Sequence, residues 1–494
     1  MSRVNYDLVK EELRGFLGPD KVFTEMFEKL AYSRDWSVRP MHDSSPPDVV
    51  VRPTSTDDVV KIVQIANRHK APVIPCGGLT GMGGGAVPTH GGITVDLKGM
   101  KDILELDKES LNVTVQAGIS IAELNEELEK HGLWFPHDPE SKLVATIGAS
   151  IATRNDTTLG IKYGKIEQSL INAVVVTGRG EPIRVGHRKT LISASGYPLH
   201  WLLVGSEGTL GLITEATLRI FPKPATRSVD MVAFSSLTGA AKALNRLIQS
   251  GISVESANLM CSNRFYYYTH AYRVKYGKPA NVPEGTKGIL CLTFNGDQKV
   301  VDFSRDHMLS TCKQLGGSLI EEKEIVNAWW ASKHTLSFEP FRQKWPDSQR
   351  TERFGAADVS VPQGRLDEAF AKYQELAAKH GIRLLGMNVY VQAPYTVHVS
   401  ISFAVYVNDK DPKEVRNFYA YVRDLALYAV SVGGSMSSYQ GDAERFGLLV
   451  KEEHGEALEY MKKVKELFDP NNIMNTGKKF GNLTWVDFME AKSQ

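Results

Sequence analysis

Six glycines stand within nine residues, from Gly77 to Gly85, directly after a short apolar stretch at 71–75. Backbone N–H groups approach an anion closely only where no Cβ intervenes, and glycine alone enters positive φ freely. Such a loop predicts either a phosphate cradle or a tight turn. The loop is not a P-loop, because no Gly-Lys-Ser/Thr follows it. It is also not the usual dinucleotide-binding fingerprint, because Ala86-Val87-Pro88 follows where that fingerprint would begin a long helix.

The bulk properties narrow the class of protein. At 494 residues the chain is long enough for two or three cores. A formal net charge of +1 gives no strong field toward nucleic acid or anionic lipid, so no nucleic-acid partner is expected. The sequence shows neither the apolar core of a signal peptide nor an apolar run long enough to span a membrane. We therefore expect a cytoplasmic protein without a transmembrane segment. Association with a membrane through a partner is left open.

The four cysteines, at 76, 261, 291 and 312, are scattered without metal-ligand or redox-motif spacing. We expect them to be small buried hydrophobic residues. The chain therefore has no set of cysteines for an iron–sulfur cluster, and any electrons that it collects must leave through another molecule.

Hydrophobic patterns predict an α+β chain. An amphipathic helix and an irregular arm are expected within 4–45, and Thr56-Asp57-Asp58 predicts the start of a helix that runs to about His69. A composition shift after Pro222-Lys223-Pro224 indicates a second α+β domain with an antiparallel sheet. Strands are predicted at 71–75, 92–97, 103–107, 112–116, 173–177, 182–185, 212–220, 231–234 and 288–294, and further helices at 120–131, 240–250, 300–315, 363–380, 412–429 and 443–468.

Three glycine-rich or small-residue segments, in this order and spacing, resemble a known family. They are Pro75–Pro88, Pro136–Thr153 closed by Lys162-Tyr163-Gly164, and Val204–Ala216, and a terminal segment, Asp469–Lys478, completes the set. Together they resemble the FAD-linked oxidases of the vanillyl-alcohol oxidase type, with the PCMH-type FAD-binding fold, and are most similar to the D-lactate dehydrogenase and glycolate oxidase branch.

The resemblance implies an α+β fold in three parts. These are a bipartite FAD-binding domain at 1–224, a substrate cap with an antiparallel sheet at 225–412, and a helical segment at 413–494 that returns to the FAD domain. Leu79 stands where some relatives attach FAD to a histidine, so non-covalent FAD is expected. The residues implied to bind it are Pro75, Gly77, Gly78, Leu79, Thr80, Gly81, Met82, Gly83, Pro139, Thr146, Ile147, Gly148, Ser150, Thr153, Gly205, Glu207, Gly208, Leu212, Ile213 and Asn475.

Two motifs depart from the pattern of that branch. Relatives usually hold a divalent metal in the cap through His-x-x-x-x-x-x-His and Gly-Glu-His-Gly, but here only His398 remains of the first, and Ser438-Tyr439-Gln440-Gly441 replaces the second. One imidazole cannot hold zinc without further ligands, so no metal is predicted. Glu453-His454-Gly455 is interpreted as a solvated helix face. Arg154-Asn155-Asp156-Thr157 stands where relatives often have Asn-Ala-Gly-Gly, which adds side chains near the flavin.

Period-two patterning predicts a hairpin of 385–393 with 396–407. If Gln392 pairs with His398, the polar residues of both strands line one surface toward the flavin. His398 is the first candidate for the base, because its unperturbed pKa lies near neutrality, and a strand residue without a catalytic role is the alternative. The other candidates for the base are Tyr390, Tyr395 and Tyr439. A carboxylate of the substrate could be bound by Arg353, Arg342 or Lys333, and the alternative for each of them is a charge on the protein surface without a role in binding.

These features favour a FAD-dependent dehydrogenase of a 2-hydroxy acid, such as D-lactate or glycolate. Its chemistry would be hydride transfer to flavin N5 with delivery of electrons to a partner protein or quinone. A homo-oligomer or a subunit of a complex is expected. The alternatives are an oxidase or dehydrogenase of another alcohol or phenol, a non-redox transferase like the alkyl-dihydroxyacetone-phosphate synthases, and a flavin subunit of a larger electron-transfer complex.

Overall fold

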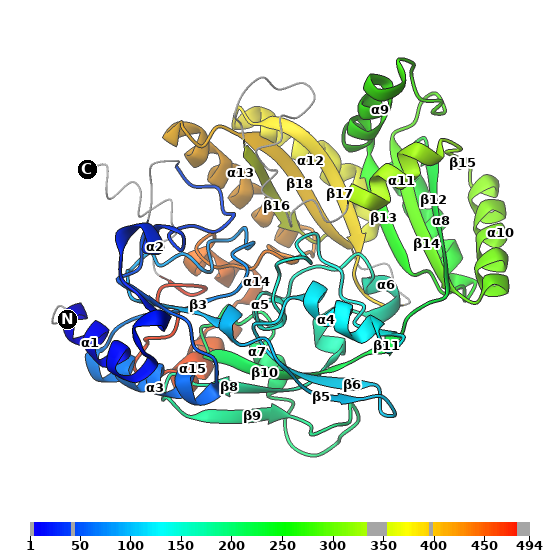
Figure 1. Ribbon diagram of the computed structural model, residues 1–494. Helices are drawn as coiled ribbons and strands as arrows, with labels where there is room; N and C mark the ends of the chain where they lie inside the picture. Colours follow the sequence, from blue (N-terminus) through cyan, green and yellow to red (C-terminus); the bar gives the residue numbers. More distant parts are fainter. Residues whose placement is uncertain (1–3, 41–44, 333–352, 395–398, 482–494) are drawn as a thin grey trace.

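Two small α/β layers and a larger cap make up the computed structural model, which describes residues 4–40, 45–332, 353–394 and 399–481 (Figure 1). The first layer holds a four-stranded sheet in the order β1-β2-β4-β3. Its strands are β1 (Val22–Phe23), β2 (Val49–Val51), β3 (Val73–Cys76) and β4 (Ile93–Asp96), of which the last three run parallel. Helices α1 (Tyr6–Leu17) and α3 (Thr56–His69) share its apolar core, and α2 (Met26–Leu30) follows β1.

The second layer is an antiparallel sheet in the order β5-β6-β10-β8-β9. The strands are β5 (Ile103–Asp107), β6 (Asn112–Gln116), β8 (Leu170–Val176), β9 (Pro182–Gly186) and β10 (Leu212–Arg219). Helices α4 (Ile121–Glu129) and α5 (Ile147–Thr153) pack on this sheet through Leu124, Ile147 and Ile151, all fully buried. The short helices α6 (Gly160–Tyr163) and α7 (His200–Leu203) and the two-stranded pair β7 (Leu133–Trp134) and β11 (Phe221–Pro222) complete it.

The cap is a sheet in the order β15-β12-β14-β13-β17-β18-β16 with helices on both faces. Alternate residues of each strand point to opposite faces, so Val232 and Phe234 join one core while Met231 and Ala233 join the other. The strands are β12 (Thr226–Phe234), β13 (Ser256–Cys261), β14 (Gly288–Gly296), β15 (Ser318–Leu319), β16 (Arg353–Val359), β17 (Arg383–Val391) and β18 (Val399–Val407). One face carries α8 (Leu237–Gln249), α10 (Gln298–Gln314), α12 (Leu366–Lys379) and α13 (Pro412–Ser431), and the other carries α9 (Ser262–Tyr276) and α11 (Lys323–Ser332).

The α+β class with its antiparallel cap sheet is confirmed, while two expectations about the C-terminal third differ from the structure. Helix α13 packs on the cap, where Val415, Phe418 and Leu425 belong to the same core as Val405, so the segment that returns to the cofactor domain begins after α13 rather than at 413. The single helix expected at 443–468 is wrong: α14 (Lys451–His454) ends before Gly455, whose φ of +54° is not helical, and α15 (Ala457–Phe468) starts anew.

The chain end joins the first layer to the rest of the cofactor domain. Val73 N donates to Ile473 O at 2.8 Å and Asn475 N donates to Val73 O at 2.8 Å, which adds a short strand pairing beside β3. Phe468 at the end of α15 enters the core of the second layer. Within the described ranges, no helix combines the length and the apolar character that crossing a bilayer requires.

Candidate active site

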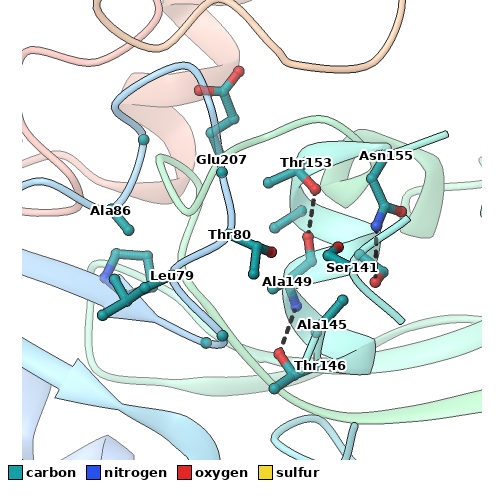
Figure 2. Close-up of a pocket in the computed structure, with 18 of the residues that line it drawn as sticks. Leu79, Thr80, Ala86, Ser141, Ala145, Thr146, Ala149, Thr153, Asn155 and Glu207 are labelled. Atoms are coloured by element: carbon teal, nitrogen blue, oxygen red, sulfur yellow. Dashed lines mark hydrogen bonds between the residues drawn. The ribbon is translucent and has the colours of Figure 1, made fainter. Parts of the chain in front are cut away.

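A cavity that opens to solvent lies between the loops of both layers and a turn late in the chain. Its walls come from the loop after β3, from the segment around α5, from the turn before β10 and from a late turn that contains Tyr439 and Gln440. Figure 2 shows Leu79, Thr80 and Ala86 of the first loop on one side, and Ser141, Thr146, Ala149 and Thr153 of the second segment facing them. The walls are mostly backbone and small side chains of glycine, alanine, serine and threonine, which leave room for a ligand to approach the loops closely.

The glycine loop after β3 packs so closely against the segment before α5 that Gly77 and Gly78 leave no space for a side chain. A Cβ on Gly78 would lie 2.1 Å from Val144 O, and one on Gly77 would lie 2.6 Å from the Thr146 hydroxyl. No backbone N–H of residues 79–83 donates to another backbone or side chain among the described residues. A row of free N–H donors without intervening side chains suits a diphosphate, so the loop fits the cofactor that the sequence predicts.

The turn before β10 is tied to the first loop and to the chain end. Glu207 has a φ of +51°, and a Cβ on Gly208 would lie 2.2 Å from Pro75 Cγ. Asn475 Nδ2 donates to Gly85 O at 2.9 Å and to Glu207 O at 2.7 Å. The Glu207 carboxylate accepts from Asp442 N at 2.8 Å and Ala443 N at 2.9 Å, and so connects this turn to the late segment of the chain.

Fifteen of the twenty residues predicted to bind FAD line the cavity. They are Pro75, Gly77, Gly78, Leu79, Thr80, Gly81, Met82, Gly83, Thr146, Gly148, Ser150, Thr153, Glu207, Gly208 and Ile213. Ile147 and Leu212 do not, because their side chains are fully buried in the cores of the two layers, and Pro139 is also buried away from it. Gly205 borders a neighbouring cavity, and Asn475 acts on the loops through its hydrogen bonds.

The late turn at 437–441 is organised by one buried carboxylate. Asp358 Oδ2 accepts from the backbone N–H groups of Ser438 at 2.8 Å, Tyr439 at 2.8 Å and Gln440 at 2.9 Å. Its Oδ1 accepts from Arg445 Nη1 at 2.7 Å, and the facing side chains of this ion pair are almost fully buried. Asp358 therefore fixes the turn that carries Tyr439 and Gln440 to the cavity wall.

The structure brings together two of the four residues predicted to be catalytic. The rings of Tyr390 and Tyr439 lie edge to face with centroids 6.4 Å apart, and Tyr390 Oη donates to Glu140 Oε1 at 2.6 Å. His398, Tyr395, Lys333 and Arg342 lie outside the described residues. The backbone of Arg353 pairs with Val407 at the start of β16, and its catalytic role stays a prediction.

The predicted hairpin register is confirmed as far as it is described. Asn388 pairs with Ser402 and Tyr390 pairs with Ser400, the same register that would set Gln392 opposite residue 398. Ser400 Oγ donates to Ser438 Oγ at 2.6 Å, so the polar face of the hairpin contacts the late turn. Gln392, which was predicted to lie on this polar face, also contacts the cofactor domain: its Oε1 accepts from Thr157 N at 3.3 Å.

Three charged residues of this region were not among the predicted site residues: Glu140 and Asp156, which line the cavity, and Lys165 behind it. Burial, reinforced by the negative charge of Glu140, raises the pKa of Asp156 to about 7. Burial lowers the pKa of Lys165 to about 8, against the opposing effect of Glu167. The sequence carried one signal, which is that Asp156 stands where relatives often have glycine, but burial and neighbours are properties of the fold.

This pKa shift predicts a pH-dependent stability that Asp156→Asn removes. In the unfolded chain the carboxyl loses its proton near pH 4, whereas the folded protein keeps it until about pH 7, so the free energy of unfolding falls as the pH rises between these values. We expect the stability advantage of the variant to be small near pH 4 and to grow toward pH 7.5, to as much as about 4 kcal/mol. Thermal unfolding of both proteins across this range measures the difference, and parallel curves would contradict it.

All four cysteines are buried and free, and burial raises the pKa of the Cys76 thiol, which borders the cavity. In the described part of the chain, no three His, Cys, Asp or Glu side chains converge as metal ligands would.

Two protein families match this chain and between them cover most of it. The family described as the FAD binding domain matches residues 47–186, and the C-terminal domain of FAD linked oxidases matches residues 223–479. The chain belongs to the FAD-linked oxidases. FAD is therefore the cofactor, and the free N–H groups of the glycine loop that lines the cavity fit its diphosphate.

The most similar relatives place the chain within that family. It is 28% identical over 478 residues to the glycolate oxidase subunit GlcD of Bacillus subtilis, covering 96% of each chain. It is 31% identical to a mitochondrial D-lactate dehydrogenase (cytochrome) of Arabidopsis thaliana, over 87% of this chain and 73% of the relative. The fold is shared with the solved 4-ethylphenol oxidase of Gulosibacter chungangensis at a TM-score of 0.77 and 16% identity, over 97% and 98% of the two chains. The protein is thus an FAD-linked oxidoreductase with the PCMH-type fold.

Proposed function

We propose that this FAD-linked oxidoreductase is a dehydrogenase of a 2-hydroxy acid of the lactate and glycolate class. The carrying observation is that Glu140 and Tyr439, which line the cavity, both contact Tyr390 of the cap and so form a polar cluster at the cavity wall. Relatives named glycolate oxidase subunit and D-lactate dehydrogenase align over nearly the whole chain, which supports this substrate class.

When bound, FAD accepts a hydride from the carbon that carries the hydroxyl group. The chain's own residues bind the substrate, exclude water and take the hydroxyl proton. The late turn held by Asp358 and the hairpin strand β17 place Tyr439 and Tyr390 where they can orient a polar substrate. We further propose that FAD is held non-covalently, because the apolar side chain of Leu79 lines the first loop at the position of attachment in some relatives.

The electrons are proposed to leave to a partner protein or a quinone, since the four cysteines lie buried in separate places and provide no cluster of their own. A second cavity shares Thr153 and Tyr439 with the first and is bordered by Trp201, which is 55% exposed. This second cavity is the proposed side of electron exit.

Anaerobic reduction of the bound flavin tests the substrate class. D-lactate, glycolate, 2-hydroxyglutarate and a phenolic alcohol are each mixed with the enzyme, and the loss of the visible flavin absorbance is followed. We expect at least one 2-hydroxy acid to bleach the flavin and the phenolic alcohol to leave it oxidised. Bleaching by the phenolic alcohol alone would assign the enzyme to phenol oxidation instead, and no bleaching by any of the four would reject a dehydrogenase of this class.

A further inference from the structure

Asp156 occupies an unusual place for a carboxyl group. It follows α5 on the cavity wall and is only 8% exposed. Among the described residues, no Lys, Arg or His lies within ion-pair distance of its carboxylate, although a buried carboxylate is normally paired. A carboxyl group that is buried, unpaired and open to a ligand cavity is costly for stability, which suggests a role in the chemistry of the cavity.

The groups around Asp156 come from every element that meets there. Negative charge comes from Glu140 and Asp358, positive charge comes from Lys165, and the phenols of Tyr390 and Tyr439 lie nearby. Lys165 is held at a distance, because its Nζ donates to Ser438 O at 2.9 Å. Asp358 is neutralised by Arg445, and Glu140 accepts the Tyr390 hydroxyl. The carboxylate of Asp156 accepts from its own backbone N–H group, and no other described side chain pairs with it, so it stays available to a molecule in the cavity.

We propose that Asp156, on the wall of the cavity, is the general base that takes the hydroxyl proton of the substrate, with Lys165 and Glu140 as positioning residues beside it. This inference rests on the proposed function. In the step, the O–H bond of the substrate breaks and its proton passes to a carboxylate oxygen of Asp156. The electron pair of that bond forms the second C–O bond, and the C–H bond pair leaves with its hydrogen as hydride to FAD, so the substrate loses two electrons and two hydrogens.

The other described candidates are less suited to this role. Burial raises the pKa of both Tyr390 and Tyr439 well above the ordinary value, so neither phenol is a base at neutral pH. Burial lowers the pKa of His137 to about 4, and this imidazole contacts Asn155 rather than the cavity. Asp156 instead changes protonation near neutrality, which suits a general base.

The experiment compares Asp156→Asn with Asp102→Asn, which alters an exposed carboxyl of the same domain. Flavin content is measured first, and anaerobic flavin reduction by the best 2-hydroxy acid is then followed across pH. We expect both variants to keep FAD, and we expect Asp156→Asn to slow the reduction by at least about 100-fold while Asp102→Asn leaves it unchanged. In the wild type the rate should rise with pH to a plateau with a midpoint near 7, and this rise should be missing in Asp156→Asn.

Substitutions of the two positioning residues should shift the midpoint of the pH–rate profile in opposite directions. Glu140→Gln removes a negative charge that raises the pKa of Asp156, so the midpoint of the rate profile should move to lower pH. Lys165→Gln removes a positive charge that lowers it, so the midpoint should move to higher pH. Unchanged midpoints in both variants would remove Glu140 and Lys165 from the proposal.

The inference and the proposed function fail in different ways. Reduction of Asp156→Asn at the wild-type rate, or with the same pH profile, would overturn the role of Asp156 and leave the substrate class standing. If no 2-hydroxy acid reduces the wild type, the proposed function fails, and any other alcohol that bleaches the flavin serves for the same comparison. Whatever the substrate, identical pH dependence of thermal unfolding in the wild type and Asp156→Asn would overturn the inference, because Asp156 would not titrate near neutrality.

Discussion

Gly78→Ala is expected to weaken FAD binding, because the new Cβ would lie 2.1 Å from Val144 O and 2.8 Å from the carbon of the same carbonyl. Both atoms are backbone, so the glycine loop and the segment before α5 would have to separate. These are the two walls of the cavity that face each other in Figure 2. Overpacking of this kind costs about 1–3 kcal/mol, which corresponds to about a 5- to 150-fold loss of affinity if the cost falls on a ligand bound between the walls.

The measurement is the molar ratio of FAD to protein after purification, together with the melting temperature. Gly15→Ala is the matched control, since its Cβ would meet no atom within 4 Å and Gly15 lies inside α1, where alanine is favoured. This control should keep its FAD and its stability. Full FAD content in Gly78→Ala would show that the two walls do not enclose the cofactor as described.

Asp358→Asn is expected to be the most destabilising single change near the site. The substitution leaves the buried guanidinium of Arg445 without its counter-charge, and it replaces an oxygen that accepts three consecutive backbone N–H groups of the late turn. Breaking a buried ion pair from one side costs about 3–5 kcal/mol. The turn would also lose the geometry that places Tyr439 and Gln440 on the cavity wall.

Thermal unfolding measures this loss, and the rate of flavin reduction reports on the turn. Glu459→Gln removes one partner of an exposed ion pair with Lys462 on α15 and should leave the melting temperature unchanged. A melting temperature of Asp358→Asn equal to that of Glu459→Gln would contradict the structural role of the Asp358–Arg445 pair.

Local sequence patterns predicted much of this fold, because the loops, strands and helices concerned depend mainly on residues that are close together in the chain. The glycines at 77–85 were interpreted as a loop that approaches an anion, and this loop does line the cavity. The period-two pattern predicted a hairpin of 385–393 with 396–407, since side chains of a strand alternate between its faces, and the assumed register agrees with the observed pairing of Tyr390 with Ser400. The helical spacing of apolar residues at 412–429 likewise predicted α13, because residues three and four apart share one face of a helix.

Features that depend on distant contacts could not be predicted in this way. Asp358 meets the late turn across some eighty residues of sequence, and nothing near it in the chain indicates that its carboxylate accepts from Ser438, Tyr439 and Gln440. The helical pattern continues through 443–456, but the hydrogen bonds of Glu207 to this segment and the turn at Gly455 prevent one long helix. The proton affinity of Asp156 likewise depends on burial and on Glu140, which the fold brings together.

Release of flavin from the purified protein tests the central claim most directly, namely that three loops of this chain enclose one FAD without a covalent bond. The protein is denatured, its precipitate is removed, and the flavin in the supernatant and in the precipitate is quantified against the protein. We expect one FAD per chain in the supernatant and none attached to the polypeptide. A colourless protein that releases no FAD and takes up none when FAD is added would contradict the account.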